Sequence, residues 1–254
     1  MEAKVFAAVE EKNAALRQYL DAHPEIAASF EPTYLITWLY HENALDGLVL
    51  TEGEIRMALE QHVVADPSTM HLLRHIRAHR KALARIEEEA RARRGKITVE
   101  LTEALYRIFL EGGRPTEKEK AIWRREIPLH RTYLHDLMEP EEIEKALPKW
   151  IKLLGAAEFR ELHPVHQAAT AHWEFMQIFP FAEHNGRIGR LVQTYYLLRA
   201  GYLAPVMHAT NRQAYYQSLR HSPEALAELL ARAMEESLDS CLRYVRSLGE
   251  KRAG

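Results

Sequence analysis

The residues best able to do chemistry lie in one short segment, FPFAEHNGRIGR, at positions 179–190. Two arginines in it, Arg187 and Arg190, are three residues apart, which makes them neighbours on the first turn of a helix. Asn185 and Gly186 come just before, so the segment predicts a loop that runs into a helix N-terminus. Free backbone N–H groups and the positive end of the helix dipole favour an anion there. Two guanidinium groups beside these donors suit two successive phosphates.

Three other side chains of the segment raise separate questions. Glu183 offers a carboxylate, and Mg²⁺ is commonly held by one or two carboxylates together with phosphate oxygens. We therefore expect Glu183 to be the metal ligand. Phe179 stands where such chemistry would need a polar group, and His184 stands where the backbone would favour glycine.

The flanking sequence predicts the helices that position this loop. Apolar residues recur at steps of three and four on both sides, which indicates one buried face on each helix. These positions are Val165, Ala168, Ala169, His172, Phe175, Met176 and Phe179 before the loop, and Ile188, Leu191, Val192, Tyr195 and Leu198 after it. We interpret His172 as a hydrogen-bonded core residue rather than a catalytic one.

Helix signals dominate the rest of the chain, so the sequence predicts an all-α fold. Gly47 is expected to end one helix, and Thr51 with Glu54 forms a capping box for the next. Long helices are expected at 70–95 and 98–111, and a last one after Ser222. Only the stretch 123–136 shows some alternation, and there we predict a short β-hairpin.

Composition limits the class of protein. The 254 residues are 47% hydrophobic with a formal net charge of -2, which argues against broad nucleic-acid or anionic-membrane binding. A single Cys241 cannot form an internal disulfide, and no signal peptide or membrane span is evident, so we expect a cytoplasmic location. We expect an N-terminal helical region at 1–95, a core at 96–220 and a C-terminal helix at 221–254, packed as one compact unit.

The segment 172–202 resembles the core of Fic-domain proteins, members of the Fido superfamily. Their pattern is H-P-F-x-[D/E]-G-N-G-R-x-x-R, and seven of its nine specified positions match here. The resemblance extends from about residue 40 to Tyr202. It implies a Fic-type helical core and transfer of AMP from ATP to a protein hydroxyl, although some relatives move other phosphate-containing groups. ATP or another nucleotide with Mg²⁺ would be the cofactor, and a protein target or regulator the partner; the sequence leaves a homodimer open.

The resemblance also implies roles for individual residues. Glu183 matches the Mg²⁺ ligand, and Asn185 with Gly186 matches the turn that cradles the phosphates. Arg187 and Arg190 match the arginines that bind the outer phosphates. The stretch AIWRREIPLHRTYL, residues 121–134, is similar to the family's flap, a short hairpin that aligns the target segment, and Trp123-Arg124 resembles the aromatic-Arg pair that precedes it.

Two departures from the motif affect catalysis. Phe179 occupies the position of the catalytic histidine, and a phenyl ring cannot accept the proton of an attacking hydroxyl. A general base is typically worth about 10²–10⁴-fold in rate, so we expect AMP transfer to be lost or strongly reduced. His184 replaces the first glycine of the loop, and it is strained if that position needs a positive φ.

The segment YHENALDG, at positions 40–47, resembles the family's inhibitory helix motif, [S/T]-x-x-x-E-[G/N]. Asp46 stands for the inhibitory glutamate, and Glu42 stands for the Ser/Thr. In relatives that glutamate pairs with the second arginine, which is Arg190 here. Aspartate is one methylene shorter, a loss of reach of about 1.5 Å. We therefore expect a weak or water-bridged pair.

Three functions remain open at this point. The first is a catalytically impaired Fic fold that binds a nucleotide or another phosphate-containing ligand. The second is an active transferase of altered chemistry that uses another base, such as His184. The third is a non-catalytic protein-interaction module. The intact arginines and Glu183 argue against the third. A row of histidines, His71, His75 and His79, has a spacing that could bind metal, but the arginines between them favour a solvated helix face.

Overall fold

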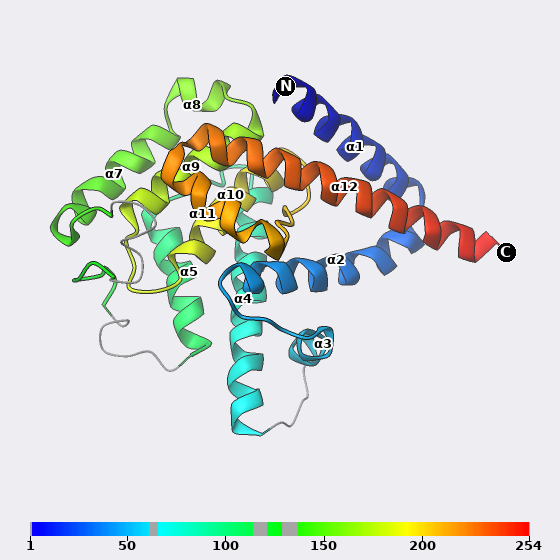
Figure 1. Cartoon of the computed structure of the whole chain (residues 1–254), viewed down its shortest axis with the longest axis horizontal. Coiled ribbons are helices and arrows are strands. Elements are labelled where there is room, and N and C mark those ends of the chain that lie inside the picture. The colour runs from blue at the N-terminus through cyan, green and yellow to red at the C-terminus, as the bar shows by residue number, and fades with distance from the viewer. Residues whose placement is uncertain (1, 61–65, 114–120, 129–136, 254) are drawn as a thin grey trace.

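The computed structural model describes residues 2–60, 66–113, 121–128 and 137–253, and this part of the chain contains helices and no strand (Figure 1). The all-α prediction is confirmed. The hairpin was predicted within residues 123–136. Residues 129–136 lie outside the described residues, and residues 123–128 form bends and irregular structure.

The helices are α1 (Glu2–Ala22), α2 (Pro24–Leu45), α3 (Glu52–Leu59), α4 (Pro67–Arg91), α5 (Val99–Glu111), η1 (Pro140–Glu142), α7 (Ile143–Leu154), α8 (Ala157–Glu161), α9 (Pro164–Ile178), α10 (Asn185–Arg199), η2 (Ala209–Asn211), α11 (Arg212–His221) and α12 (Pro223–Ala253).

Local side-chain chemistry sets several helix ends as the sequence predicts. The Thr51 hydroxyl accepts a hydrogen bond from Glu54 N, and the Glu54 carboxylate accepts one from Thr51 N, which completes the capping box of α3. Ser222 caps α12 by accepting from Ala225 N at 3.2 Å. Gly47 follows α2 with φ +88, a conformation that favours glycine.

The centre of the molecule is the pair α9 and α10, joined by the loop that the sequence singled out. Gly189 of α10 faces α9 so closely that an added Cβ would lie 2.7 Å from His172 Cδ2. The long α12 crosses this pair, with α1 running beside it, while α4 and α2 pack from the other side (Figure 1). The loop at 179–184 is therefore held between two buried helices.

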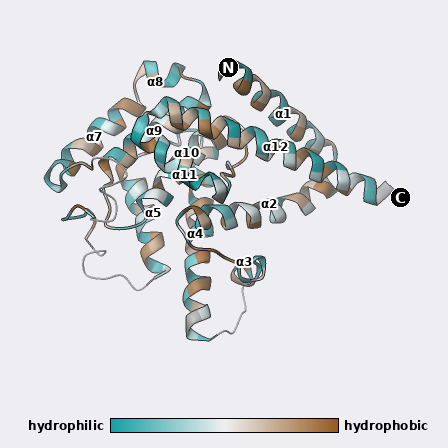
Figure 2. Ribbon diagram, viewed as in Figure 1, coloured by the Kyte–Doolittle hydropathy of each residue, from teal (hydrophilic) through white to brown (hydrophobic). Residues whose placement is uncertain are grey.

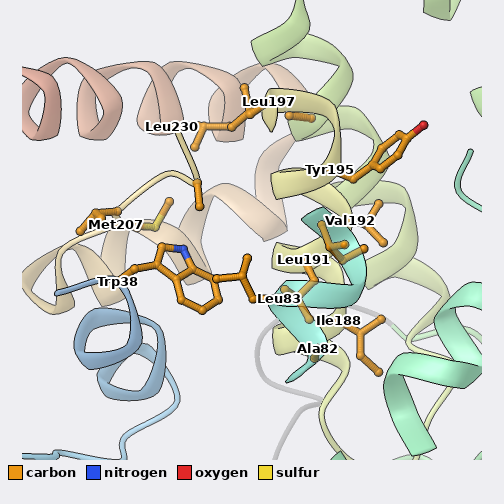
Figure 3. Packing of buried hydrophobic residues seen from close by; sticks show 14 of the residues in the cluster. Trp38, Ala82, Leu83, Ile188, Leu191, Val192, Tyr195, Leu197, Met207 and Leu230 are labelled. Atoms are coloured by element: carbon orange, nitrogen blue, oxygen red, sulfur yellow. The ribbon is translucent and has the colours of Figure 1, made fainter. Parts of the chain in front are cut away.

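One apolar cluster connects these elements, with buried members from α1 to α12. Figure 3 shows part of it, where Trp38 of α2 lies beside Leu83 of α4 and near the row formed by Ile188 and Leu191 on α10. Polar and apolar residues alternate along α4 and α12, as expected for helices that bury one face (Figure 2). Among the described helices, none combines the length and the apolar character that a bilayer crossing requires.

Candidate functional site

The loop between α9 and α10 is closed by a single side chain. Asn185, the first residue of α10, accepts a hydrogen bond from Phe181 N at 2.9 Å and donates one to Phe181 O at 2.7 Å. Phe181 is itself fully buried, and its ring stacks on Tyr106 at 4.4 Å between centroids. Both ends of the turn are thus tied to the core, and the loop has its shape without any ligand.

Two residues of the loop have left-handed backbone conformations. Phe179 ends α9 with φ 48 and ψ 59, and His184 precedes α10 with φ 64 and ψ 7. The position of His184 thus has the positive φ that was the condition for strain there. Such values cost a non-glycine residue about 1–2 kcal/mol, and a bulky phenylalanine tolerates them less well than histidine. The fold imposes this geometry at both ends of the loop.

A buried arginine fixes the loop from the side. Arg124 donates from Nε to the carbonyl of Phe179 at 2.7 Å, and its Nη2 donates to the carbonyls of Ile178 and Met138. Its backbone N–H donates to Pro180 O at 2.9 Å. These acceptors include carbonyls that the end of α9 leaves without helical partners. The sequence had placed Arg124 next to the flap, but its hydrogen bonds to the carbonyls of this loop were not predicted.

Arg190 is the most enclosed charged residue of the site, since its side chain is 2% exposed. Its Nε donates to Glu42 Oε2 at 2.6 Å, and its Nη2 donates to Asp46 Oδ1 at 3.1 Å and to Glu42 O at 3.3 Å. Nη1 lies 3.4 Å from the hydroxyl of Tyr215. Burial disfavours its charged form, but Asp46 and Glu42 outweigh this and hold the pKa of Arg190 well above its ordinary value.

Arg187 shares the same carboxylate. Its Nε donates to Asp46 Oδ2 at 2.7 Å, so the two oxygens of Asp46 bridge the two arginines. The expectation of a weak or water-bridged pair between Asp46 and Arg190 is wrong. The shorter side chain still reaches because the C-terminal end of α2 comes close to α10. Gly186 allows this approach: an added Cβ would lie 3.1 Å from Arg190 Nη1 and 3.5 Å from Asp46 Oδ1.

Glu42 is a second carboxylate that the sequence did not assign to the arginines. It lies one helical turn before Asp46, on the same face of α2, and it is 4% exposed. Burial raises the pKa of Glu42, while the adjacent Arg190 opposes the shift. The i, i+4 spacing of the two acids was the available signal. Together, Glu42 and Asp46 of the α2 end give the two arginines two carboxylate partners.

A chain of hydrogen bonds continues from Arg190 into the core. The Tyr215 hydroxyl lies 3.1 Å from His172 Nε2, and His172 Nδ1 lies 2.8 Å from the side-chain oxygen of Gln193. Burial lowers the pKa of His172 to about 3, so its ring is neutral and Nδ1–H donates to Gln193. The interpretation of His172 as a hydrogen-bonded core residue is confirmed.

The prediction that the histidine row of α4 is a solvated face is wrong for His75 and His79, although His71 is exposed. His79 is fully buried between Trp38 and Phe109, with ring centroids 5.1 Å and 5.4 Å away, and His75 is half-buried. Burial lowers the pKa of His75 to about 3. No cluster of three potential metal ligands occurs in the described part of the chain.

Glu183 and His184 lie in the loop just before α10, next to the arginine pair. Both are half-buried, and Glu183 makes no ion pair with the described residues. His184 Nδ1 is 3.5 Å from Arg187 Nη1, and its ring stacks on Phe109 at 5.1 Å between centroids. The site therefore has two buried cations and one carboxylate at its edge, while Phe179 is 4% exposed and supplies no proton acceptor.

Residues 73–197 match the family model described as Fic/DOC family. The chain carries a Fic domain. Among curated relatives, Protein adenylyltransferase Fic of Drosophila willistoni is 26% identical over 239 residues, covering 92% of this chain and 46% of that protein. The protein of the same name from Nematostella vectensis is 24% identical over 210 residues, covering 80% and 48%. The chain spans about half the length of these Fic relatives.

Solved structures show the same fold around the Fic domain. A Fic domain containing signaling protein from Bacteroides thetaiotaomicron superposes with a TM-score of 0.73 at 19% identity, covering 94% of this chain and 97% of that one. Fic-1 from C. elegans gives 0.75 at 20% identity, covering 96% and 75%. At these identities the likeness establishes the fold alone.

Proposed function

We propose that this chain is a Fic-fold protein that binds a nucleotide or another phosphate-containing ligand at Arg187 and Arg190, with AMP transfer to protein hydroxyls lost or strongly reduced. The observation that supports this most strongly is the left-handed, buried Phe179 at the end of α9, beside a loop that keeps Glu183 and Asn185. The arginines, the Asn185 turn and Glu183 retain the chemistry of an anion site. The residue that would take the proton is missing.

Binding at this site must compete with α2. Every guanidinium nitrogen of Arg190 is engaged by Glu42, Asp46 or Tyr215, so a phosphate has to replace at least the Asp46 carboxylate. The donor set fits a nucleotide: Arg187 and Arg190 would hold the outer phosphates, and Glu183 would hold Mg²⁺ that neutralises them. A protein target or regulator is the proposed partner, and a homodimer and a cytoplasmic location remain part of the proposal.

The test is Phe179→His, made together with Asp46→Ala so that the phosphate site is open. Histidine is tolerated at a left-handed position better than phenylalanine, so the backbone can keep its conformation. The protein is incubated with labelled ATP, Mg²⁺ and a cell lysate, and protein labelling is compared with that by Asp46→Ala alone. Labelling by the double variant, with none by Asp46→Ala alone, would support a site that lacks only its base. Absence of both nucleotide binding and labelling in every variant would contradict the proposal and favour a non-catalytic interaction module.

A transferase that uses His184 as its base is the alternative function. The observation in its favour is the 3.5 Å separation between His184 Nδ1 and Arg187 Nη1, which puts the imidazole beside the proposed phosphate position. Robust labelling by the unmodified protein, abolished by His184→Asn, would establish this alternative. Asparagine tolerates the left-handed conformation, so this variant removes the base and leaves the loop geometry intact.

A further inference from the structure

A cavity at the opposite end of α10 is separate from the candidate nucleotide site. Its volume is about 570 Å³, which is within the usual range for ligand pockets. It lies between the connection from α4 to α5, the ends of α7 and α8, and the last turn of α10. Arg199, which lines it, is twelve residues beyond Arg187 on the same helix. At 1.5 Å per residue the two positions are about 18 Å apart.

The charged residues that line this cavity are all cationic. They are Lys96, Arg160 and Arg199, and no aspartate or glutamate of the described residues is among the lining. The remaining walls are mostly apolar or phenolic, with buried Ile97, Leu154 and Phe159 below the cations. An apolar floor with a cationic rim fits a ligand that carries both an apolar group and negative charge.

Hydrogen bonds hold the walls in place, among them one from the backbone N–H of Lys96 to the Glu89 carboxylate at 3.0 Å. Arg199 donates from Nη1 to Ala92 O at 3.0 Å, so its positive charge is oriented but not neutralised. The Tyr195 hydroxyl donates to Gly95 O at 2.7 Å, and Figure 3 shows this hydroxyl pointing away from the other labelled side chains of the cluster. The cavity is therefore formed before any ligand arrives, which lowers the entropic cost of binding.

Positive charge continues outside the cavity along the end of α4. The exposed cations there are Arg91, Arg93 and Arg94. None of them forms an ion pair with the described residues. The nearby acids of α4 are used by other cations, since Glu89 pairs with Arg85 at 2.9 Å and Glu87 pairs with Arg80 at 3.3 Å. Glu88 is exposed and lies 3.9 Å from Arg85, and Glu100 lies near Lys96, so this surface carries more basic than acidic side chains and extends the cationic rim.

We propose that this surface binds an acidic segment of a protein partner, with one aliphatic or aromatic side chain of that segment seated in the cavity. A small anion would need only the cations of the rim. The apolar floor and the further cations along residues 91–94 instead fit an extended chain that carries several carboxylates on either side of an apolar anchor. This site is independent of the proposed nucleotide site.

The test uses fluorescence anisotropy of a labelled peptide of alternating aspartate and glutamate with one central leucine. Lys96→Glu with Arg160→Glu should weaken binding about 5- to 25-fold, because two exposed charge pairs, each worth up to about fivefold, are lost. The matched control, Arg243→Glu with Arg246→Glu, makes the same change of net charge on exposed positions of α12 and should leave affinity within about twofold.

A second variant tests the anchor. Gly155 lines the cavity with φ -91, and an added Cβ would meet no atom closer than 3.6 Å, so the backbone accepts a side chain there and Gly155→Phe adds a ring beside the cavity. It should weaken the leucine peptide and leave a serine-centred peptide unchanged. Equal binding of the two peptides, an equal effect of the control pair, or tighter binding of a single-stranded oligonucleotide than of the leucine peptide would overturn the proposal.

Discussion

Removal of the Asp46 carboxylate should both destabilise the protein and increase its affinity for phosphates. In Asp46→Ala, Arg187 loses the 2.7 Å contact and Arg190 loses the 3.1 Å contact. Charge-assisted hydrogen bonds are worth about 1.5–3 kcal/mol each, but Asp46 is 23% exposed, and solvent screening reduces the sum to about 2–3 kcal/mol. In a chain of this size that corresponds to a fall in Tm of about 4–12 °C.

The same free energy opposes a ligand in the unmodified protein. A phosphate that binds Arg187 and Arg190 must displace Asp46, so the variant should bind Mg²⁺ with ATP or pyrophosphate about 30-fold more tightly or better. Calorimetric titration measures the affinity, and thermal unfolding with and without ligand measures the stabilisation. The gain remains incomplete because Glu42 still holds Arg190 at 2.6 Å.

The control is Asp239→Ala, which removes an exposed carboxylate that lies 2.7 Å from Lys12. Its loss of stability should stay below about 1 kcal/mol, with no change in nucleotide affinity. The reasoning fails if Asp46→Ala is as stable as the unmodified protein. It also fails if the variant loses stability and no phosphate ligand restores it, since the arginines would then be a structural ion-pair network.

Three further outcomes are expected from purified variants. His79→Leu should raise the free energy of unfolding by about 1–3 kcal/mol, since both ring nitrogens of His79 are buried without a described partner, and burial lowers its pKa. The gain should grow as pH falls below about 6.5, where the unfolded histidine becomes protonated; a constant gain in chemical denaturation from pH 8 to 5 would refute this. Gly189→Ala should destabilise by about 1–3 kcal/mol through overlap with His172, whereas Gly53→Ala, with open space around it, should not destabilise. Arg124→Met should raise the rate of amide hydrogen exchange at residues 179–184 more than elsewhere, because the carbonyls there lose their donors.

The sequence predicts the helices and the loop between α9 and α10 because these depend on local signals. The spacing of apolar residues and the capping residues predict where α3, α5 and α12 begin, and the glycine at position 47 predicts the end of α2. The positive φ of His184 was expected from the motif, and the structure has it. Such features are decided within a few residues of the chain.

What the sequence could not predict depends on contacts between distant segments. Asp46 and Arg187 are 141 residues apart, and a side chain one methylene shorter reaches its partners because the two helix ends approach closely. The burial of His79 follows from the position of α2 and α5 around α4, whereas its charged neighbours in the sequence suggested solvent. Arg124 contacts Phe179 across 55 residues, a pairing that no local pattern encodes.

The meeting of α2 and α10 has a further electrostatic consequence. Asp46 lies at the negative end of its own helix dipole and Arg187 lies at the positive end of its own, so each charge is unfavourable where its chain puts it. Where the two helix ends meet, each charge lies next to the other helix. The Asp46 carboxylate lies at the positive N-terminal end of α10, and the guanidinium groups lie at the negative C-terminal end of α2. Withdrawal of α2 would therefore leave both helix ends electrostatically mismatched at once. A phosphate could correct the mismatch at α10 alone, so an open state of this site would still need a cation for the end of α2.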